Sequence, residues 1–146
     1  MRRTIRDRNI LFLCEDNASL SQMAEAVAKH LDPPEVKIFS AGIQPTTIPS
    51  QVYKVMEELG VSLKGQSSKK MNEVPLNEID LVISFQGADK KCSPLPKRTK
   101  VEQWSIPAQD SSDKSSPATL TRYRHERDEI NKRVFALFLD YWRNDA

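Results

Sequence analysis

The segment LFLCEDNASLSQMAE, residues 11–25, runs from an apolar stretch through Cys14 and a short polar loop into a helical pattern. A loop of this kind turns several backbone N–H groups toward its centre, and the dipole of the following helix adds partial positive charge. We therefore expect an anion to bind above Cys14 and the pKa of its thiol to fall. A thiolate below a bound oxyanion is a nucleophile directed at phosphorus or arsenic.

The hydroxyl groups of this loop have two interpretations. Ser21, at the start of the helix, is placed either to hydrogen-bond the sulfur or to cap the helix. In the competing interpretation, Cys14 is a buried strand-end residue that packs as a small hydrophobe, and Ser19 and Ser21 are only helix caps. The loop alone does not decide between them. The candidate oxyanion-binding positions are Glu15, Asp16, Asn17, Ala18, Ser19 and Leu20.

Strand and helix patterns alternate along the chain, which predicts an α/β fold with a parallel sheet. In open parallel sheets the binding crevice lies beyond the carboxyl ends of the strands, and Cys14 ends the first one. We expect one domain over residues 1–146, with a four-stranded parallel sheet flanked by helices on both faces. The expected strands are 9–14, 36–42, one within 77–85, and 100–104, and the expected helices are 21–31, 49–60 and 117–142.

Composition and charge narrow the functional classes. The chain has 146 residues, which suits one domain, and its net charge of +2 is spread out, so we expect no nucleic-acid partner. Two cysteines, Cys14 and Cys92, make neither a disulfide framework nor a zinc-site spacing. The only apolar run near the start is too short for a signal peptide or a membrane span, so we expect a cytoplasmic protein without a membrane partner.

Several short segments carry a resemblance that covers nearly the whole chain: Cys14, Asn17, SQMAE (21–25), FSAG (39–42), residues 55–74, DLVIS (80–84) and Trp104. Together, and in this order, they resemble the low-molecular-weight protein tyrosine phosphatase superfamily, and within it the thioredoxin-coupled arsenate reductases. The resemblance implies the same four-stranded fold, Cys14 as nucleophile, Ser21 as its partner, and an oxyanion ligand such as phosphate, sulfate or arsenate. We expect no cofactor, and no metal, because neither histidine is near a plausible ligand cluster.

The sequence departs from the family pattern in three places. Leu20 stands where the family loop carries an arginine, whose two charge-assisted hydrogen bonds are worth about two to four decades in rate or affinity. The general-acid aspartate falls near Ala108; Asp110 is the possible acid, but solvation of the loop is the favoured interpretation of both Asp110 and Asp113. One redox cysteine of the reductases falls near Gln86, which leaves Cys92 as the possible redox thiol, with a direct Cys14–Cys92 disulfide as one arrangement. An unpaired loop thiol is the favoured interpretation of Cys92.

Other charges near the loop bear on the missing arginine. Lys69, Lys70 and Lys90 are candidates to replace it, on the basis of charge alone. Glu15 and Asp16 put negative charge at the rim of an anion site and oppose phosphate or arsenate binding.

We therefore predict a degenerate phosphatase or arsenate reductase-like protein with impaired or absent catalysis, which binds an oxyanion or a protein partner. The alternative is an active thiol enzyme that uses Cys14, with arsenate reductase as the first choice and protein tyrosine phosphatase as the second. A third hypothesis is an interaction module that uses aromatic residues of the last helix, for which core packing is the competing explanation. These aromatic residues are Tyr123, Phe135, Phe138, Tyr141 and Trp142.

Overall fold

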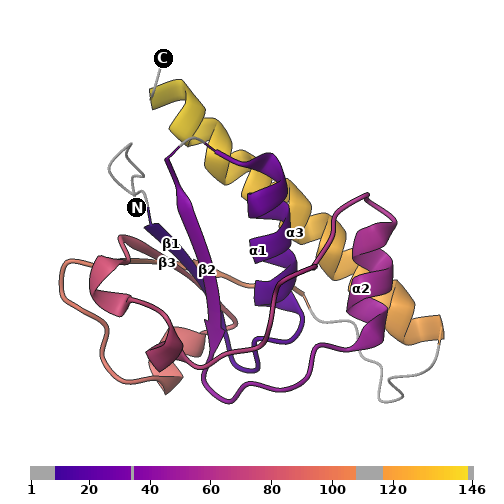
Figure 1. Cartoon of the computed structure of the whole chain (residues 1–146), viewed down its shortest axis with the longest axis horizontal. Helices are drawn as coiled ribbons and strands as arrows, with labels where there is room; N and C mark the ends of the chain where they lie inside the picture. The colour runs from indigo at the N-terminus through magenta and orange to yellow at the C-terminus, as the bar shows by residue number, and fades with distance from the viewer. Residues whose placement is uncertain (1–8, 34, 108–116, 145–146) are drawn as a thin grey trace.

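A four-stranded parallel sheet in the order β2-β1-β3-β4 forms the centre of the molecule. It is seen in a computed structural model that describes residues 9–33, 35–107 and 117–144 (Figure 1). The alternating pattern of the sequence thus predicted the fold class correctly, and the predicted four-stranded parallel sheet is confirmed. The strands are β1 (Asn9–Cys14), β2 (Lys37–Gly42), β3 (Leu81–Phe85) and β4 (Lys100–Trp104).

The two faces of the sheet are covered by different kinds of helix. The three α-helices pack together on one face, and three short 3-10 helices lie over the other (Figure 1). The prediction of helices on both faces is therefore confirmed, although the helices on the second face are single 3-10 turns. The α-helices are α1 (Leu20–Leu31), α2 (Ser50–Glu57) and α3 (Pro117–Asn144), and the 3-10 helices are η1 (Met71–Glu73), η2 (Leu76–Glu78) and η3 (Ala88–Lys91).

Strand β1 is buried on both faces, as the central strand of a covered parallel sheet must be. Ile10 and Phe12 point into the core beneath the α-helices, whereas Leu11 and Leu13 point into the core beneath the 3-10 helices. All four are fully buried, and each contributes roughly 1.5–3 kcal/mol of transfer free energy. This double anchoring fixes the position of Cys14, the last residue of the strand.

Most predicted boundaries agree with the structure to within a residue or two, but α2 is shorter than predicted. It ends at Glu57 rather than at residue 60, because the chain turns into a left-handed conformation at Gly60, with a φ of 71°. The N–H of Val61 then reaches back to the carbonyl of Met56 over 3.1 Å, a bond typical of a glycine-terminated helix end. The three 3-10 helices were not predicted, because a single turn carries no periodic pattern.

Core packing explains two of the described aromatic residues of α3, but not the third. Tyr123 and Phe138 are buried in the core beneath the α-helices, whereas Phe135 is 47% exposed. The side chains of Tyr141 and Trp142 lie outside the described residues. Within the described part of the chain, no helix is both long enough and apolar enough to cross a membrane.

Candidate functional site

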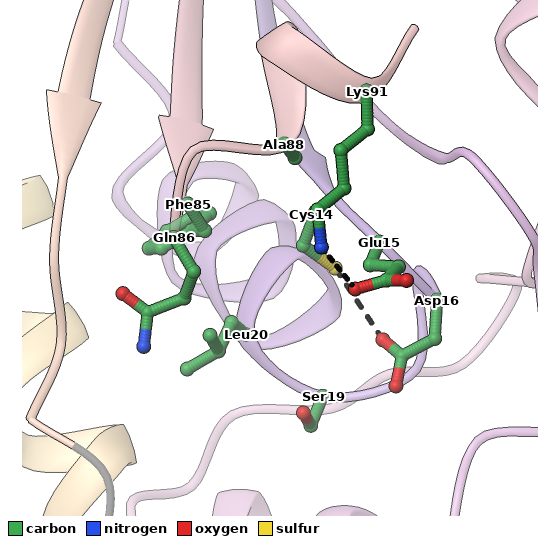
Figure 2. Close-up of a pocket in the computed structure, with 9 residues that line it drawn as sticks. All are labelled: Cys14, Glu15, Asp16, Ser19, Leu20, Phe85, Gln86, Ala88 and Lys91. Atoms are coloured by element: carbon green, nitrogen blue, oxygen red, sulfur yellow. Dashed lines mark hydrogen bonds and ion pairs between the residues drawn. The ribbon is translucent and has the colours of Figure 1, made fainter.

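The Cys14 loop (residues 14–21) borders a cavity of about 160 Å³ at the carboxyl ends of β1 and β3 (Figure 2). We call it the Cys14 cavity. Its place is the one that open parallel sheets favour for ligand binding. Most of the predicted oxyanion-loop positions border it, together with residues that follow β3. The lining residues are Cys14, Glu15, Asp16, Ser19, Leu20, Phe85, Gln86, Ala88 and Lys91.

Gly42, the last residue of β2, allows the loop to lie directly against the sheet. A Cβ atom at this position would lie 2.8 Å from the backbone nitrogen of Asn17 and 2.9 Å from its Cβ. The next residue, Ile43, donates its N–H to the carbonyl of Glu15 at 2.9 Å and so extends the contact between β2 and the loop. The glycine of FSAG is therefore required by the close approach of two backbone segments.

Asn17 is the central residue of the loop. It is fully buried and has a φ of 48°, a left-handed conformation that asparagine tolerates better than most residues. Its side-chain oxygen accepts the N–H of Lys69 at 2.9 Å. Its side-chain nitrogen donates to Ser21 Oγ at 2.8 Å and to Ser40 Oγ at 3.0 Å. These bonds fix the amide orientation and tie the loop to β2 and to the segment before η1.

The sulfur of Cys14 lies at the base of the cavity among hydrogen-bonding groups. It is 2.8 Å from Ser21 Oγ, and it accepts the backbone N–H of Asn17 at 3.2 Å. Because Ser21 Oγ already accepts from the Asn17 amide, its own proton is available for the sulfur. Of the two predicted roles for Ser21, the structure therefore places its hydroxyl on the sulfur. Ser19 precedes α1 but makes no side-chain cap hydrogen bond.

Burial, rather than the hydrogen bonds, decides the direction of the Cys14 pKa. The thiol is only 4% exposed, and desolvation raises its pKa above the ordinary value. The hydrogen bond from Ser21 lowers it and the charge of Asp16 raises it again, with burial the largest effect. The predicted fall in pKa was therefore wrong, since it counted the N–H donors and left out the loss of solvation.

A buried carboxylate extends the hydrogen-bond network that holds the Cys14 loop against β2. Glu25 is 3% exposed and accepts a hydrogen bond from Ser40 Oγ, the hydroxyl that also contacts Asn17. Lys29 and Lys69 pair with the Glu25 carboxylate, the latter at 3.7 Å. We did not single out Glu25 and Ser40 from the sequence, although both lie inside the quoted segments SQMAE and FSAG. The sequence did not indicate that the side chains of Glu25 and Ser40 are both buried.

The ligand-facing side of the loop carries charge. Asp16 Oδ1 accepts the backbone N–H of Ala18 at 3.1 Å and lies 3.5 Å from the Cys14 sulfur, whose S–H donates to it. The Glu15 carboxylate turns toward Lys91, with 3.0 Å between Oε2 and Nζ (Figure 2). Leu20 presents an apolar side chain to the same cavity.

The lysine that reaches the cavity differs from those expected. Lys69 Nζ donates to the carbonyl of Ser67 at 2.9 Å and lies beside Glu25, and Lys70 borders a separate cavity. Lys91, the residue after Lys90, lines the Cys14 cavity and also the cavity that Lys70 borders. Charge alone could not separate neighbouring lysines, because the single turn of η3 decides which one faces the site.

The remaining predicted residues are dispersed. Gln86 lines the Cys14 cavity. Its side-chain amide makes two hydrogen bonds to the chain after β4: it donates to the carbonyl of Ile106 at 2.7 Å and accepts the Ile106 N–H at 3.0 Å. Cys92 borders another cavity, of about 280 Å³, and its thiol donates to the carbonyl of Asp89 at 3.2 Å. Asp110 lies outside the described residues, among which we find no cluster of three or more potential metal ligands.

The fold and the loop together define a family. Residues 9–143 match the family model for low molecular weight phosphotyrosine protein phosphatase, and the chain belongs to this family. Among curated relatives, the arsenate reductase of Bacillus subtilis (strain 168) is 33% identical over 126 residues, which cover 86% of this chain and 91% of the relative. The arsenate reductase of Bacillus licheniformis is 32% identical over 128 residues, or 87% and 92% of the two chains.

Solved structures agree with this placement. An arsenate reductase in its phosphate-binding state is 27% identical with a TM-score of 0.73, over 92% of this chain and 98% of the other. The arsenate reductase of Archaeoglobus fulgidus is 27% identical with a TM-score of 0.68, over 88% and 97%. A thioredoxin-dependent arsenate reductase of Corynebacterium glutamicum gives a TM-score of 0.75 at 24% identity, and this chain spans 61% of it.

Proposed function

We propose that this protein is a slow thiol enzyme of the arsenate reductase type, with Cys14 as the nucleophile. The observation that carries the proposal is the position of the sulfur, which lies at the start of α1 within 2.8 Å of Ser21 Oγ and 3.2 Å of the Asn17 nitrogen. Both contacts stabilise a thiolate during attack. Similarity to proteins named arsenate reductase over about nine tenths of their length supports the choice of reaction.

The proposed reaction needs two thiols for one arsenate. Cys14 Sγ attacks the arsenic atom, a sulfur–arsenic bond forms, and one arsenate oxygen leaves as water after taking up protons. A second thiol then attacks Cys14 Sγ, a disulfide forms, and the electron pair of the broken sulfur–arsenic bond reduces arsenic from the pentavalent to the trivalent state. The Cys92 thiol donates to the carbonyl of Asp89, and Cys92 is not among the residues that line the Cys14 cavity. We therefore assign the second thiol to an external dithiol. Its other thiol then attacks the mixed disulfide, leaves the dithiol oxidised and releases Cys14 as a free thiol.

Two features lower the expected rate. Leu20 offers no hydrogen bond where an arginine would contribute two charge-assisted ones, which corresponds to about two to four decades. The raised pKa of Cys14 also leaves less thiolate at neutral pH than an ordinary cysteine would supply. We therefore expect turnover far below that of a relative with the arginine.

The test measures arsenite released from arsenate in the presence of a small dithiol. We expect slow release by the unmodified protein, none by Cys14→Ser, and an increase of about 100-fold or more in Leu20→Arg, whose side chain would enter the cavity. Leu20→Gln is the matched control, since it adds length and polarity without charge. Equal release by the unmodified protein and Cys14→Ser, with no gain in Leu20→Arg, would contradict the proposal.

A binding protein without turnover is the second candidate function, and Leu20 on the cavity wall is the observation that favours it. For this function we expect phosphate, sulfate or arsenate at millimolar concentration to shift the backbone amide signals of residues 14–21, while arsenite release stays at the level of Cys14→Ser. Hydrolysis of an aryl phosphate that disappears in Cys14→Ser would instead indicate phosphatase activity.

A further inference from the structure

The side chain of Asp16 lies in the Cys14 cavity, directly beside the Cys14 sulfur. Its Oδ1 lies 3.5 Å from the Cys14 sulfur, which is about the distance at which a reacting atom must approach a nucleophile. The same oxygen accepts the N–H of Ala18, a donor that an oxyanion bound in the loop would otherwise use. In Figure 2 the Asp16 carboxylate lies beside the sulfur, and the Glu15 carboxylate is directed to Lys91.

The hydrogen bonds around Cys14 direct its thiol proton toward Asp16. The amide of Asn17 donates to Ser21 Oγ, which lies 2.8 Å from the sulfur, and the Asn17 N–H donates to the sulfur itself. The sulfur is thus already an acceptor on its buried side, and its own proton is donated to Asp16 on the cavity side. Asp16 therefore contacts the reacting atom itself.

The described lining of the cavity has a net negative charge. Two carboxylates, Glu15 and Asp16, face one ammonium group, Lys91, which leaves one negative charge. Lys91 is paired with Glu15 at 3.0 Å, so its charge is compensated before any ligand arrives. The carboxylate closest to the sulfur is thus left without a compensating cation in the lining.

We propose that Asp16 determines the charge specificity of this site, so that the Cys14 cavity admits small uncharged electrophiles in preference to anionic ones. The inference rests on the proposed function in taking Cys14 as the reacting group. It adds a reason for the slow reaction with arsenate, because arsenate is an anion that Asp16 repels, whereas a neutral thiol-reactive molecule meets no such repulsion. Removing the charge of Asp16 should restore the acceptance of anions.

Two alkylating reagents of nearly equal shape and different charge test this proposal. Iodoacetamide is neutral and iodoacetate is an anion; with either one, the Cys14 sulfur forms a bond to carbon, iodide leaves, and the thiol proton passes to solvent. Site-resolved mass spectrometry gives both rates at Cys14, and their ratio is divided by the ratio for free cysteine. Taking the ratio of the two rates cancels the fraction of Cys14 that is deprotonated, because both reagents react with the same thiolate.

We expect the normalised preference for iodoacetamide to be about tenfold in the unmodified protein, as one carboxylate a few ångströms away would produce. It should fall to about twofold or less in Asp16→Asn, which keeps the acceptor for the Ala18 N–H. The comparison variant is Glu15→Gln, which removes an equal charge one residue away; because it also frees Lys91, it should lower the preference, but by no more than about twofold. Amide spectra establish that each variant is folded.

Three results would overturn the inference: a preference within twofold of free cysteine, the same preference in Asp16→Asn, or no reaction of Cys14 with either reagent. Arsenate turnover is measured separately on the same proteins. A preference that depends on Asp16 without arsenite release would leave the charge specificity standing and reject the reductase function. Arsenite release together with an unchanged reagent preference in Asp16→Asn would support the reductase function and reject the charge specificity.

Discussion

The two sides of the Cys14 loop are built differently. On the buried side, Asn17 makes hydrogen bonds to Ser21, Ser40 and the Lys69 backbone, and every one of these partners is supplied by the protein. On the ligand-facing side, the cavity presents an aspartate and a leucine. The hydrogen bonds that position the thiol and the side chains that line the cavity come from different residues, so the cavity lining can change while the loop keeps its position.

Removing the central residue of the buried side should have the largest effect on stability. Asn17→Ala removes one hydrogen bond from each of two buried hydroxyls, removes the acceptor of the Lys69 N–H, and places alanine in a left-handed conformation. We expect a loss of about 3–5 kcal/mol in the free energy of unfolding, measured in urea. The exposed Asn72→Ala should change it by less than about 0.5 kcal/mol. Similar values for both variants would show that the loop does not depend on Asn17.

Forcing the loop away from β2 should be the next largest effect. In Gly42→Ala, the new methyl group meets the Asn17 nitrogen at 2.8 Å, and we expect a loss of about 1–3 kcal/mol together with shifted amide signals in the Cys14 loop. Gly60→Ala is the control, because its methyl group would meet nothing within 4 Å. That variant is strained only by its positive φ and should leave the loop signals in place, whereas shifts in both would contradict the comparison.

The Ser21 hydroxyl joins the two sides of the loop, and its removal should affect the thiol more than the fold. Its hydrogen bond lowers the pKa of Cys14, so Ser21→Ala should move the pH profile of Cys14 alkylation to higher pH. Ser19→Ala removes a hydroxyl from the same loop that makes no cap hydrogen bond, and should leave the profile unchanged. A profile that moves to lower pH in Ser21→Ala would show that its hydroxyl does not stabilise the thiolate.

Burial of Cys14 should also appear in the alkaline stability of the protein. Because the folded-state pKa is raised, the favourable contribution of this thiol is present below its unfolded pKa and is lost as pH rises through the folded value. Unfolding in urea at several alkaline pH values should therefore show a smaller decline for Cys14→Ala than for the unmodified protein. Tyr123, whose pKa burial also raises, contributes a decline of the same sign in both proteins and serves as the internal reference.

The exposed ion pair at the mouth of the cavity should have the smallest effect. Lys91 and Glu15 are 55% and 60% exposed, so Lys91→Gln should change the free energy of unfolding by less than about 0.5 kcal/mol. The same change frees the Glu15 carboxylate, and the preference of Cys14 for iodoacetamide should increase modestly, by about twofold. A loss in the free energy of unfolding as large as that of Gly42→Ala would contradict this prediction and show that Lys91 helps to hold the loop in position.

The sequence by itself determined the order of strands and helices, the parallel sheet and the location of the thiol loop. Apolar runs and helical spacing depend on local burial patterns, and Cys14 lies where the first strand ends, so these features can be read without coordinates. The prediction that Leu20 replaces an arginine also comes from the sequence alone, because it follows from the resemblance and from residue identity. The family motifs contained Glu25 and Ser40, but no pattern indicated that they support Asn17.

Only the tertiary structure decided the electrostatics of the site. The direction of the Cys14 pKa depends on burial by distant core residues, which outweighs the local donors that the loop sequence suggests. The different roles of Glu15 and Asp16 also follow from packing, because η3 brings Lys91 to one carboxylate and leaves the other beside the sulfur. Charge and solvation act through space between segments far apart in the chain, and the sequence order does not record those distances.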